Sequence, residues 1–292
     1  MADHPEATRV RVGDQVLRLT SLSKIMYPST DTTKGEVLDY YARVAPLLLP
    51  RLADRPVTRV RWPHGVARER FFEKNLPSGA PAWLPRVGLQ GVTYPLAVDL
   101  AGLTYLANLN SLEFHVPQWR LGPQGAPGNP DRLVVDLDPG PPAGLTECAQ
   151  VALLVRDRLS PLGMALVPVT SGSKGMQLYA ALGSDLGSNQ VRDLVAHLAK
   201  ELTQAHPELV VWKMRTSLRP GKVFVDWSQN VAAKTTISPY SMRGRELPTV
   251  ATPVTWDEVE AKAQGAGELR QFLFSEALDR IERLGDLMVD IP

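Results

Sequence analysis

The chain has 292 residues, of which 44% are hydrophobic, and a formal net charge of +1. This length is enough for one large domain or two lobes with a substantial core. Its single cysteine, Cys148, excludes a disulfide framework and any zinc site built from cysteines. The first residues lack the segments of an export signal, and no apolar run reaches membrane-spanning length, so we expect a cytoplasmic protein without a membrane partner.

Charge is distributed unevenly along the chain. Segment 51–74 has seven Lys or Arg residues against three acids, and segment 213–245 has seven against one. Segment 255–292 reverses this balance, with nine acids and four bases. Both basic segments also contain aromatic residues, which suits base stacking beside phosphate binding, although an ordinary solvated surface has the same composition.

The amino-terminal part is predicted to mix helices and short strands. Thr33 and Glu36 form a capping-box pattern ahead of apolar residues at helical spacing, which predicts a helix over 34–49. Further elements are expected as strands at 57–62, 71–74 and 92–98 and a helix at 101–112. The Gly, Pro and Asn-rich segment 122–130 predicts a turn or a junction between lobes.

The remainder reads as an alternating series of strands and helices. Strands are predicted at 132–138, 165–170, 176–181, 209–213 and 222–227, and helices at 145–159 and 188–204. Two short helices at 256–263 and 275–284 complete the chain.

An acidic pair marks the end of the strand predicted at 132–138. Asp136 and Asp138 are two positions apart, so a strand places both on one face, with Cα atoms roughly 6.5–7 Å apart. Two carboxylates at this separation can share one or two divalent cations. Asp-x-Asp is also a common way to solubilise a strand end, so its meaning depends on what accompanies it.

A small-residue turn joins the strands predicted at 165–170 and 176–181. Ser171, Gly172, Lys174 and Gly175 supply a hydroxyl, a positive charge and backbone amides that can approach an anion closely, which suits a triphosphate. The spacing is not that of a Walker A loop. A plain hairpin turn would have the same composition.

A third segment contributes another acid. Asp226 ends the strand predicted at 222–227 and is the only acid in a basic neighbourhood. It could pair with a nearby cation or complete a three-carboxylate metal site. The loop 234–245 that follows carries hydroxyl and guanidinium groups able to grip a polyanion.

Together these segments resemble the primase-polymerases of the archaeo-eukaryotic primase superfamily, specifically the polymerase domain of bacterial ligase D. Asp136 and Asp138 match the first motif, residues 171–175 match Ser-Gly-x-Lys-Gly, Asp226 matches the third motif, and 234–245 matches Lys-Thr-Thr-Ile-x-Pro-Tyr-Ser-x-Arg-Gly-Arg. The resemblance covers nearly the whole chain. It implies an α+β, mixed α/β fold with a central, mostly antiparallel, RRM-like sheet flanked by helices. Residues 1–292 would form one catalytic domain, with an amino-terminal lobe to about 125 and a catalytic lobe from about 126.

The resemblance also implies roles for individual residues. The three acids would be catalytic and would bind two Mn²⁺ or Mg²⁺ ions. A nucleoside triphosphate would be bound by Ser171, Gly172, Lys174, Gly175, Gln177, His115, Lys234 and Arg243. DNA would be bound by Lys24, Lys34, Arg61, Phe71 and Phe72, the lysines holding a 5′-phosphate and the phenylalanines stacking on the template. For His115, a core histidine is the alternative by residue type alone.

One position departs from the family pattern. The second motif normally ends in histidine, and here that position is Gln177. Glutamine keeps hydrogen-bond donors but cannot become a cationic ring beside phosphates. We expect weaker nucleotide binding or an altered nucleotide preference, with loss of activity as the alternative.

The expected function is template-dependent nucleotide addition by two-metal phosphoryl transfer, filling short gaps or ends during DNA repair, with ribonucleotides among the substrates. Expected partners are DNA with a 5′-phosphate, NTP or dNTP, a Ku protein and a DNA ligase, with the protein monomeric and at the nucleoid during repair. The absence of a Lys-x-Asp-Gly ligase motif and the short length predict a stand-alone polymerase unit. The alternatives are a DNA-end binding module without catalysis and a haloacid-dehalogenase-type phosphohydrolase.

Overall fold

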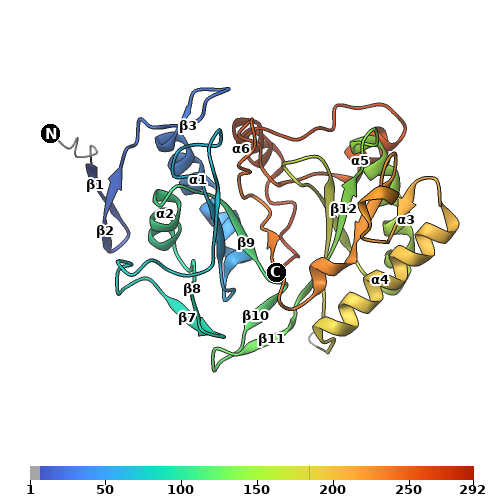
Figure 1. The fold of residues 1–292 in the computed structure, drawn as a ribbon, viewed down its shortest axis with the longest axis horizontal. Coiled ribbons are helices and arrows are strands. Elements are labelled where there is room, and N and C mark those ends of the chain that lie inside the picture. Colours follow the sequence, from blue (N-terminus) through green and yellow to red (C-terminus); the bar gives the residue numbers. More distant parts are fainter. Residues whose placement is uncertain (1–6, 184) are drawn as a thin grey trace.

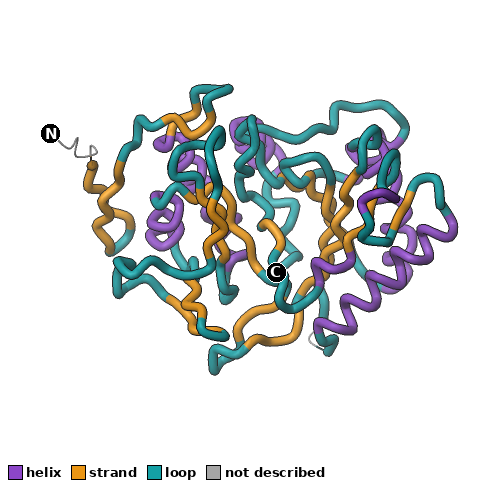
Figure 2. Tube along the Cα trace, viewed as in Figure 1, coloured by secondary structure: helices purple, strands orange, loops and turns teal. Residues whose placement is uncertain are grey.

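Two β-sheets stand side by side in the computed structural model, which describes residues 7–183 and 185–292 (Figure 1). The first sheet has the order β17-β9-β5-β6 and the second the order β15-β16-β12-β14-β13-β18. Figure 2 shows that helices lie mainly toward the outer sides of the two sheets. No helix among the described residues is both long and apolar enough to span a membrane.

The first sheet is antiparallel throughout. Its strands are β5 (Thr58–Arg61), β6 (Phe71–Glu73), β9 (Ser111–Val116) and β17 (Thr236–Ile237). Helices α1 (Lys34–Leu52) and α2 (Leu100–Asn108) pack with it, and four two-stranded pairs surround or follow it: β1 (Ala7–Val12) with β2 (Gln15–Thr20), β3 (Ile25–Tyr27) with β4 (Thr32–Thr33), β7 (Arg86–Leu89) with β8 (Val92–Pro95), and β10 (Trp119–Leu121) with β11 (Pro127–Pro130).

The second sheet is antiparallel except for the short parallel pair β15 and β16. Its strands are β12 (Arg132–Pro139), β13 (Leu166–Thr170), β14 (Met176–Ala181), β15 (Val210–Val211), β16 (Val223–Asp226) and β18 (Thr252–Pro253). The helices of this half are α3 (Leu145–Leu159), α4 (Ser188–Ala205) and α5 (Trp256–Ala263), with 3₁₀ turns at Ser160–Leu162, Thr216–Leu218 and Trp227–Asn230. Helix α6 (Phe274–Leu284) packs instead against α1 in the core of the first sheet. The mostly antiparallel central sheet predicted from the resemblance is confirmed.

The two faces of β12 have different neighbours, and this decides where the acids point. Leu133, Val135 and Leu137 are buried in the core formed with α3, α4 and α5. Alternation therefore turns Asp136 and Asp138 to the opposite face, which the helices leave uncovered.

The core of the first sheet draws on distant parts of the chain. Buried Tyr240, Met242 and Val250 join residues of α1, β5 and β9 in one apolar cluster. Strand β17 also comes from this late segment and pairs with β9. Residues beyond 125 thus complete the amino-terminal core, while the division of one domain into lobes near residue 125 stays a prediction.

Several predicted boundaries were wrong. The helix predicted at 101–112 ends at Asn108, because the chain turns at Asn110, which has φ +63°, and enters β9. The segment 122–130 forms the predicted turn over 122–126, but residues 127–130 form strand β11 despite the prolines, since β11 pairs only with β10 in a two-stranded hairpin. The strand predicted at 209–213 is reduced to Val210–Val211 at the sheet edge.

Candidate active site

Neighbouring strands bring together residues that are far apart in the sequence. Asp136 on β12 lies directly opposite Asp226 on β16 and opposite Gln177 on β14. The Gln177 Nε2 donates a hydrogen bond of 3.1 Å to Asp136 Oδ1, and the Tyr179 hydroxyl donates to Gln177 Oε1 at 3.0 Å. The strands that carry the three sequence motifs are therefore neighbours in the sheet.

The carboxyl group of Asp136 is held in an environment that disfavours its charge. Burial, reinforced by the charges of Asp226 and Asp138, raises the pKa of Asp136 to about 7, although the hydrogen bond from Gln177 works in the opposite direction. Among the described residues, no cation forms an ion pair with Asp136. Its negative charge is left to be neutralised by a proton or by a ligand.

Asp138 forms ion pairs with two basic side chains. Lys174 Nζ lies 3.0 Å from Asp138 Oδ1, and Arg219 Nη1 lies 3.1 Å from Oδ2. The guanidinium of Arg219 also lies over the Phe224 ring, 3.8 Å from its centroid. Arg219 was missed by the sequence analysis, since its position in a loop gives no periodic signal.

Asp226 is turned to local partners. One of its oxygens accepts hydrogen bonds from the backbone and hydroxyl of Ser228, and the other accepts from Gln229 Nε2 at 2.9 Å. The Lys234 ammonium donates in turn to the Ser228 hydroxyl. Within the described part of the chain, no three His, Cys, Asp or Glu side chains are grouped so that they could hold a metal ion. The predicted third acid is thus adjacent in the sheet, but its oxygens do not converge with those of Asp136 and Asp138.

The turn between β13 and β14 is shaped by close packing. Gly172 has φ +68°, and a Cβ there would lie 2.5 Å from Cγ of Arg243. A Cβ at Gly175 would lie 2.0 Å from the Leu137 carbonyl oxygen. The Ser171 hydroxyl accepts the backbone N–H groups of Ser173 and Gly175, both at 3.2 Å. Glycine is therefore required at both positions, and the turn sits directly against the strand that carries the acids.

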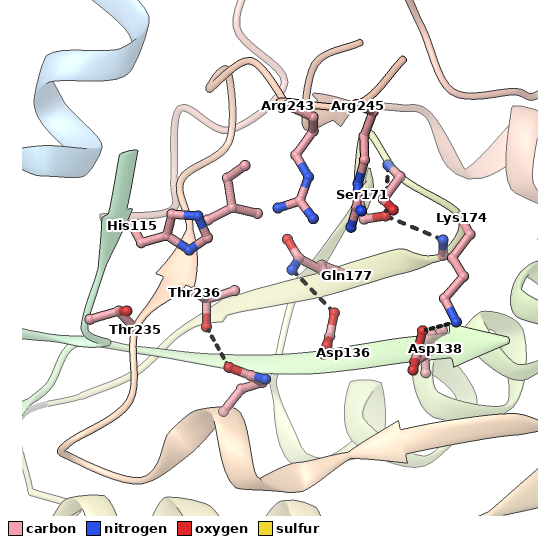
Figure 3. A pocket seen from close by; sticks show the side chains of 15 residues that line it. His115, Asp136, Asp138, Ser171, Lys174, Gln177, Thr235, Thr236, Arg243 and Arg245 are labelled. Carbon is pink, nitrogen blue, oxygen red and sulfur yellow. Dashed lines mark hydrogen bonds and ion pairs between the residues drawn. The ribbon is translucent and has the colours of Figure 1, made fainter. Parts of the chain in front are cut away.

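A polar pocket of about 220 Å³ opens between this turn and the acids (Figure 3). Asp136 and Asp138 lie on one side with the Lys174 ammonium beside Asp138, and the guanidinium groups of Arg243 and Arg245 lie on the other. Its lining consists of His115, Asp136, Leu137, Asp138, Ser171, Ser173, Lys174, Gly175, Gln177, Gln229, Thr235, Thr236, Ile237, Arg243 and Arg245. Such an arrangement fits a ligand that combines bound cations with phosphate groups.

Glu113 is a residue of this site that the sequence analysis missed. Its carboxylate accepts a hydrogen bond from His115 Nε2 at 2.8 Å and from the Gly244 backbone at 3.0 Å, and lies 3.5 Å from Arg243 Nη1. Although burial alone would raise it, these partners lower the pKa of Glu113 to about 2. The alternation Glu-x-His on one strand was the available signal, because it places both side chains on one face.

Buried tyrosines hold the loop that carries Arg243. The Tyr27 hydroxyl donates to the Arg243 carbonyl at 2.7 Å, and the Tyr40 hydroxyl donates to the Tyr240 carbonyl at 2.8 Å. Arg243 Nε is buried without a hydrogen-bond partner among the described residues. The Arg243 side chain lines the pocket, and a guanidinium held at a pocket wall is suited to an incoming anion.

A second basic cluster lies apart from the pocket lining. Lys34 is only 2% exposed, and its ammonium donates to the Thr20 carbonyl at 2.8 Å and lies 3.3 Å from the Thr20 hydroxyl. Burial, together with the charges of Lys24 and Arg61, lowers the pKa of Lys34 to about 8. Lys24 donates to the Pro63 carbonyl, and Arg61 forms an ion pair with Glu73 at 2.5 Å. The structure brings these three predicted residues together.

The two predicted stacking residues are exposed on β6. Phe71 is 46% exposed and Phe72 is 59% exposed. The Phe72 ring meets the His115 ring edge to face, with centroids 6.2 Å apart. Since His115 lines the pocket, Phe72 stands beside its entrance.

Comparison with known proteins places the chain in a family. The family model described as LigD, primase-polymerase domain, matches residues 33–288. The chain is 48% identical over 279 residues to the multifunctional non-homologous end joining protein LigD of Mycolicibacterium smegmatis, covering 94% of this chain and 36% of that protein. It is 34% identical over 270 residues to the bifunctional LigD of Bacillus subtilis, covering 92% of this chain and 43% of that protein. The chain therefore spans less than half the length of these relatives.

A solved structure shows the same relationship. The polymerase domain of Mycobacterium tuberculosis ligase D, solved in complex with DNA, superposes with a TM-score of 0.88 at 47% identity, covering 94% of this chain and 99% of that one. This match confirms the recognised resemblance and contradicts the haloacid-dehalogenase alternative. The chain belongs to the LigD primase-polymerase domain family, a family of nucleotidyltransferases that use a divalent metal and a nucleoside triphosphate.

Proposed function

We propose that this chain adds nucleotides to a primer strand at short gaps or broken ends of DNA, copying a template, as part of end joining. The observation that carries the proposal is the pocket in which Asp136 and Asp138 face Lys174 and Arg243. Acids that can bind cations and bases that can bind phosphate meet there within one small volume. This is the equipment that phosphoryl transfer to a nucleic acid 3′-hydroxyl requires.

Two divalent ions, Mn²⁺ or Mg²⁺, would be held by Asp136, Asp138 and Asp226. The raised pKa of Asp136 supports the fit, because three neighbouring carboxylates favour a bound cation. Binding requires Asp138 to give up its contacts with Lys174 and Arg219, and Asp226 to give up its contact with Gln229. When bound, such ions activate the attacking hydroxyl and neutralise charge on the triphosphate.

The nucleotide would lie between the acids and the turn at 171–175. Lys174, once released from Asp138, and Arg243, whose side chain lines the pocket, would bind the phosphate groups. Glu113 would keep His115 and Arg243 in position at the pocket wall. We include ribonucleotides among the substrates, as the family resemblance implies.

The DNA would be bound by the two clusters outside the pocket. The 5′-phosphate beyond the gap would be bound by Lys24 and Lys34, since a buried ammonium without a carboxylate partner is stabilised by an anion. Phe71 and Phe72 would stack on the template. We further propose that an end-binding Ku protein and a DNA ligase act on the same ends.

The deciding experiment is extension of a primer across a short gap in a duplex with a downstream 5′-phosphate. Wild-type protein with Mn²⁺ should extend the primer by the templated nucleotide, and parallel reactions with ribo- and deoxyribonucleotides show which is preferred. The double variant Asp136→Ala/Asp138→Ala should lose extension while it still binds the DNA. Extension that persists in this variant would refute the assignment, and binding by wild type without extension would favour the end-binding alternative.

A further inference from the structure

The β1–β2 hairpin has one face that packs on the protein and one that is basic. Leu17 and Leu19 are buried in the core of the first sheet, with Val10 and Val12 packed against it. The opposite face consists of the cross-strand pairs Ala7 with Thr20, Arg9 with Arg18, and Arg11 with Val16. All three arginines on it are exposed, and no acid shares this face.

The placement of these arginines has no evident structural benefit. Arg9 and Arg18 are directly opposite each other, and like charges in such a cross-strand pair are destabilising. Within residues 7–183 and 185–292, neither of them nor Arg11 forms an ion pair with a carboxylate. A concentrated, unpaired positive face of this kind fits a polyanion.

The hairpin runs directly into the cluster proposed to hold the 5′-phosphate. Thr20, its last residue, accepts the Lys34 ammonium through its carbonyl group. Asn108 of α2 fixes this junction, accepting from the Thr20 N–H at 3.2 Å and donating to the Arg18 carbonyl at 3.0 Å. The hairpin therefore holds a defined position relative to Lys34. It lies outside the region that the family model matches, which begins at residue 33.

The geometry points to a new contact surface: we propose that Arg9, Arg11 and Arg18 bind the phosphate backbone of the DNA duplex downstream of the gap. A strand advances roughly 3.3 Å per residue, and a DNA strand advances roughly 3.4 Å along the helix axis per nucleotide. The arginine face runs over five residues from Val16 to Thr20, or four strand steps, and thus extends over about four base pairs beyond the 5′-phosphate. This inference rests on the proposed 5′-phosphate site.

The test compares two pairs of charge-removing substitutions. Arg9→Gln/Arg18→Gln removes the opposed pair, and Arg158→Gln/Lys200→Gln removes two exposed charges from α3 and α4 at the far side of the molecule (Figure 1). DNA affinity is measured without nucleotide or divalent ion, on gapped DNA whose downstream duplex is about two or about ten base pairs long. Measurements at 50 mM and 200 mM salt give the number of phosphate contacts.

Wild type and the Arg158→Gln/Lys200→Gln control should bind the long downstream duplex more tightly than the short one, and with a steeper dependence on salt. The Arg9→Gln/Arg18→Gln variant should bind the long and short downstream duplexes equally well. Raising the salt from 50 mM to 200 mM should weaken DNA binding by a factor about tenfold smaller in this variant than in wild type, as expected for two lost phosphate contacts. Its melting temperature should be unchanged or higher. The proposal would be overturned if DNA affinity depended on duplex length and on salt to the same extent in both variants. Comparison of 5′-phosphate with 5′-hydroxyl DNA tests the Lys34 site separately, and primer extension tests the activity.

Discussion

Replacing Asp136 with asparagine should stabilise the metal-free protein at neutral and alkaline pH. The pKa of Asp136 is raised from 3.8 to about 7 by burial and by the neighbouring charges of Asp226 and Asp138. A carboxyl whose pKa is higher in the folded state destabilises the fold when it is ionised. This penalty is complete above about pH 7 and disappears as the pH falls toward 3.8. Asparagine keeps the shape and the acceptor for Gln177 without the charge.

The expected size of the effect follows from the pKa shift. The difference between a pKa of about 7 in the folded protein and the ordinary value of 3.8 corresponds to roughly 4 kcal/mol. Asp136 is partly accessible through the pocket, and water there reduces the penalty, so roughly 4 kcal/mol is an upper limit. We expect about 1–2 kcal/mol, or a melting temperature higher by a few degrees in a protein of this size.

The assay is thermal unfolding of wild type and Asp136→Asn at about pH 8 and about pH 4, in the presence of a chelator. The variant should melt at a higher temperature near pH 8, and the difference should vanish near pH 4. Added Mn²⁺ should raise the melting temperature of wild type more than that of the variant, because a ligand that binds only the folded state stabilises it. Asp157→Asn, at an exposed acid on α3, is the control and should show neither effect. A variant less stable than wild type near pH 8 would refute the reasoning.

Three further outcomes are expected. The preference for 5′-phosphate over 5′-hydroxyl DNA should weaken between pH 7 and pH 9, since burial and two nearby cations lower the pKa of Lys34 to about 8. In Lys34→Arg, whose guanidinium stays charged over this range, the preference measured in the same binding assay should stay constant. Glu113→Gln should lose roughly 2 kcal/mol of stability at pH 7. Melting curves should show this difference shrink as the pH falls from 4.5 toward the Glu113 pKa of about 2, and the KM of the variant for nucleotide should rise. Gln177→His should lower the KM for nucleotide several-fold; an unchanged KM would mean that the neutral amide suffices.

Local patterns predicted the helices well. Thr33 and Glu36 form the expected capping box at the start of α1, and helices α3 and α5 have the predicted bounds. Helix α1 nevertheless continues to Leu52 through Pro50, because buried Leu48 and Leu52 hold its last turn against the core. The signals that start and stop a helix lie within a few residues of one another, so they can be predicted from the sequence. Tertiary contacts that extend a helix involve distant residues and cannot be predicted in this way.

Short strands were predicted less well. Strand β17 has two residues, Thr236 and Ile237, and exists because β9 is available to pair with it. Strand β11 contains prolines that argue against a strand, and it forms where only one partner is needed. Such elements are stabilised by the partner rather than by their own sequence, so pattern analysis cannot anticipate them.

Only part of the candidate site could be predicted from patterns within single strands. Alternation along β12 was sufficient to place Asp136 and Asp138 together, since it concerns one strand. The position of Asp226 opposite Asp136 required the order of the strands, which only the resemblance supplied. The partners that now hold the acids, Arg219 for Asp138 and Gln229 for Asp226, come from loops and 3₁₀ turns without any periodicity.

The neutral side chain at position 177 affects the charge of Asp136, because the order of the strands places the two residues opposite each other. Gln177 is the cross-strand neighbour of Asp136 and donates a hydrogen bond to it. A protonated histidine at this place would put a positive charge beside Asp136 and so lower the pKa of its carboxyl group. Glutamine stabilises the carboxylate only through the hydrogen bond, which leaves more of the negative charge for bound cations to neutralise. The substitution should therefore favour cation binding at the acids even as it removes a possible positive charge from the phosphate side of the pocket.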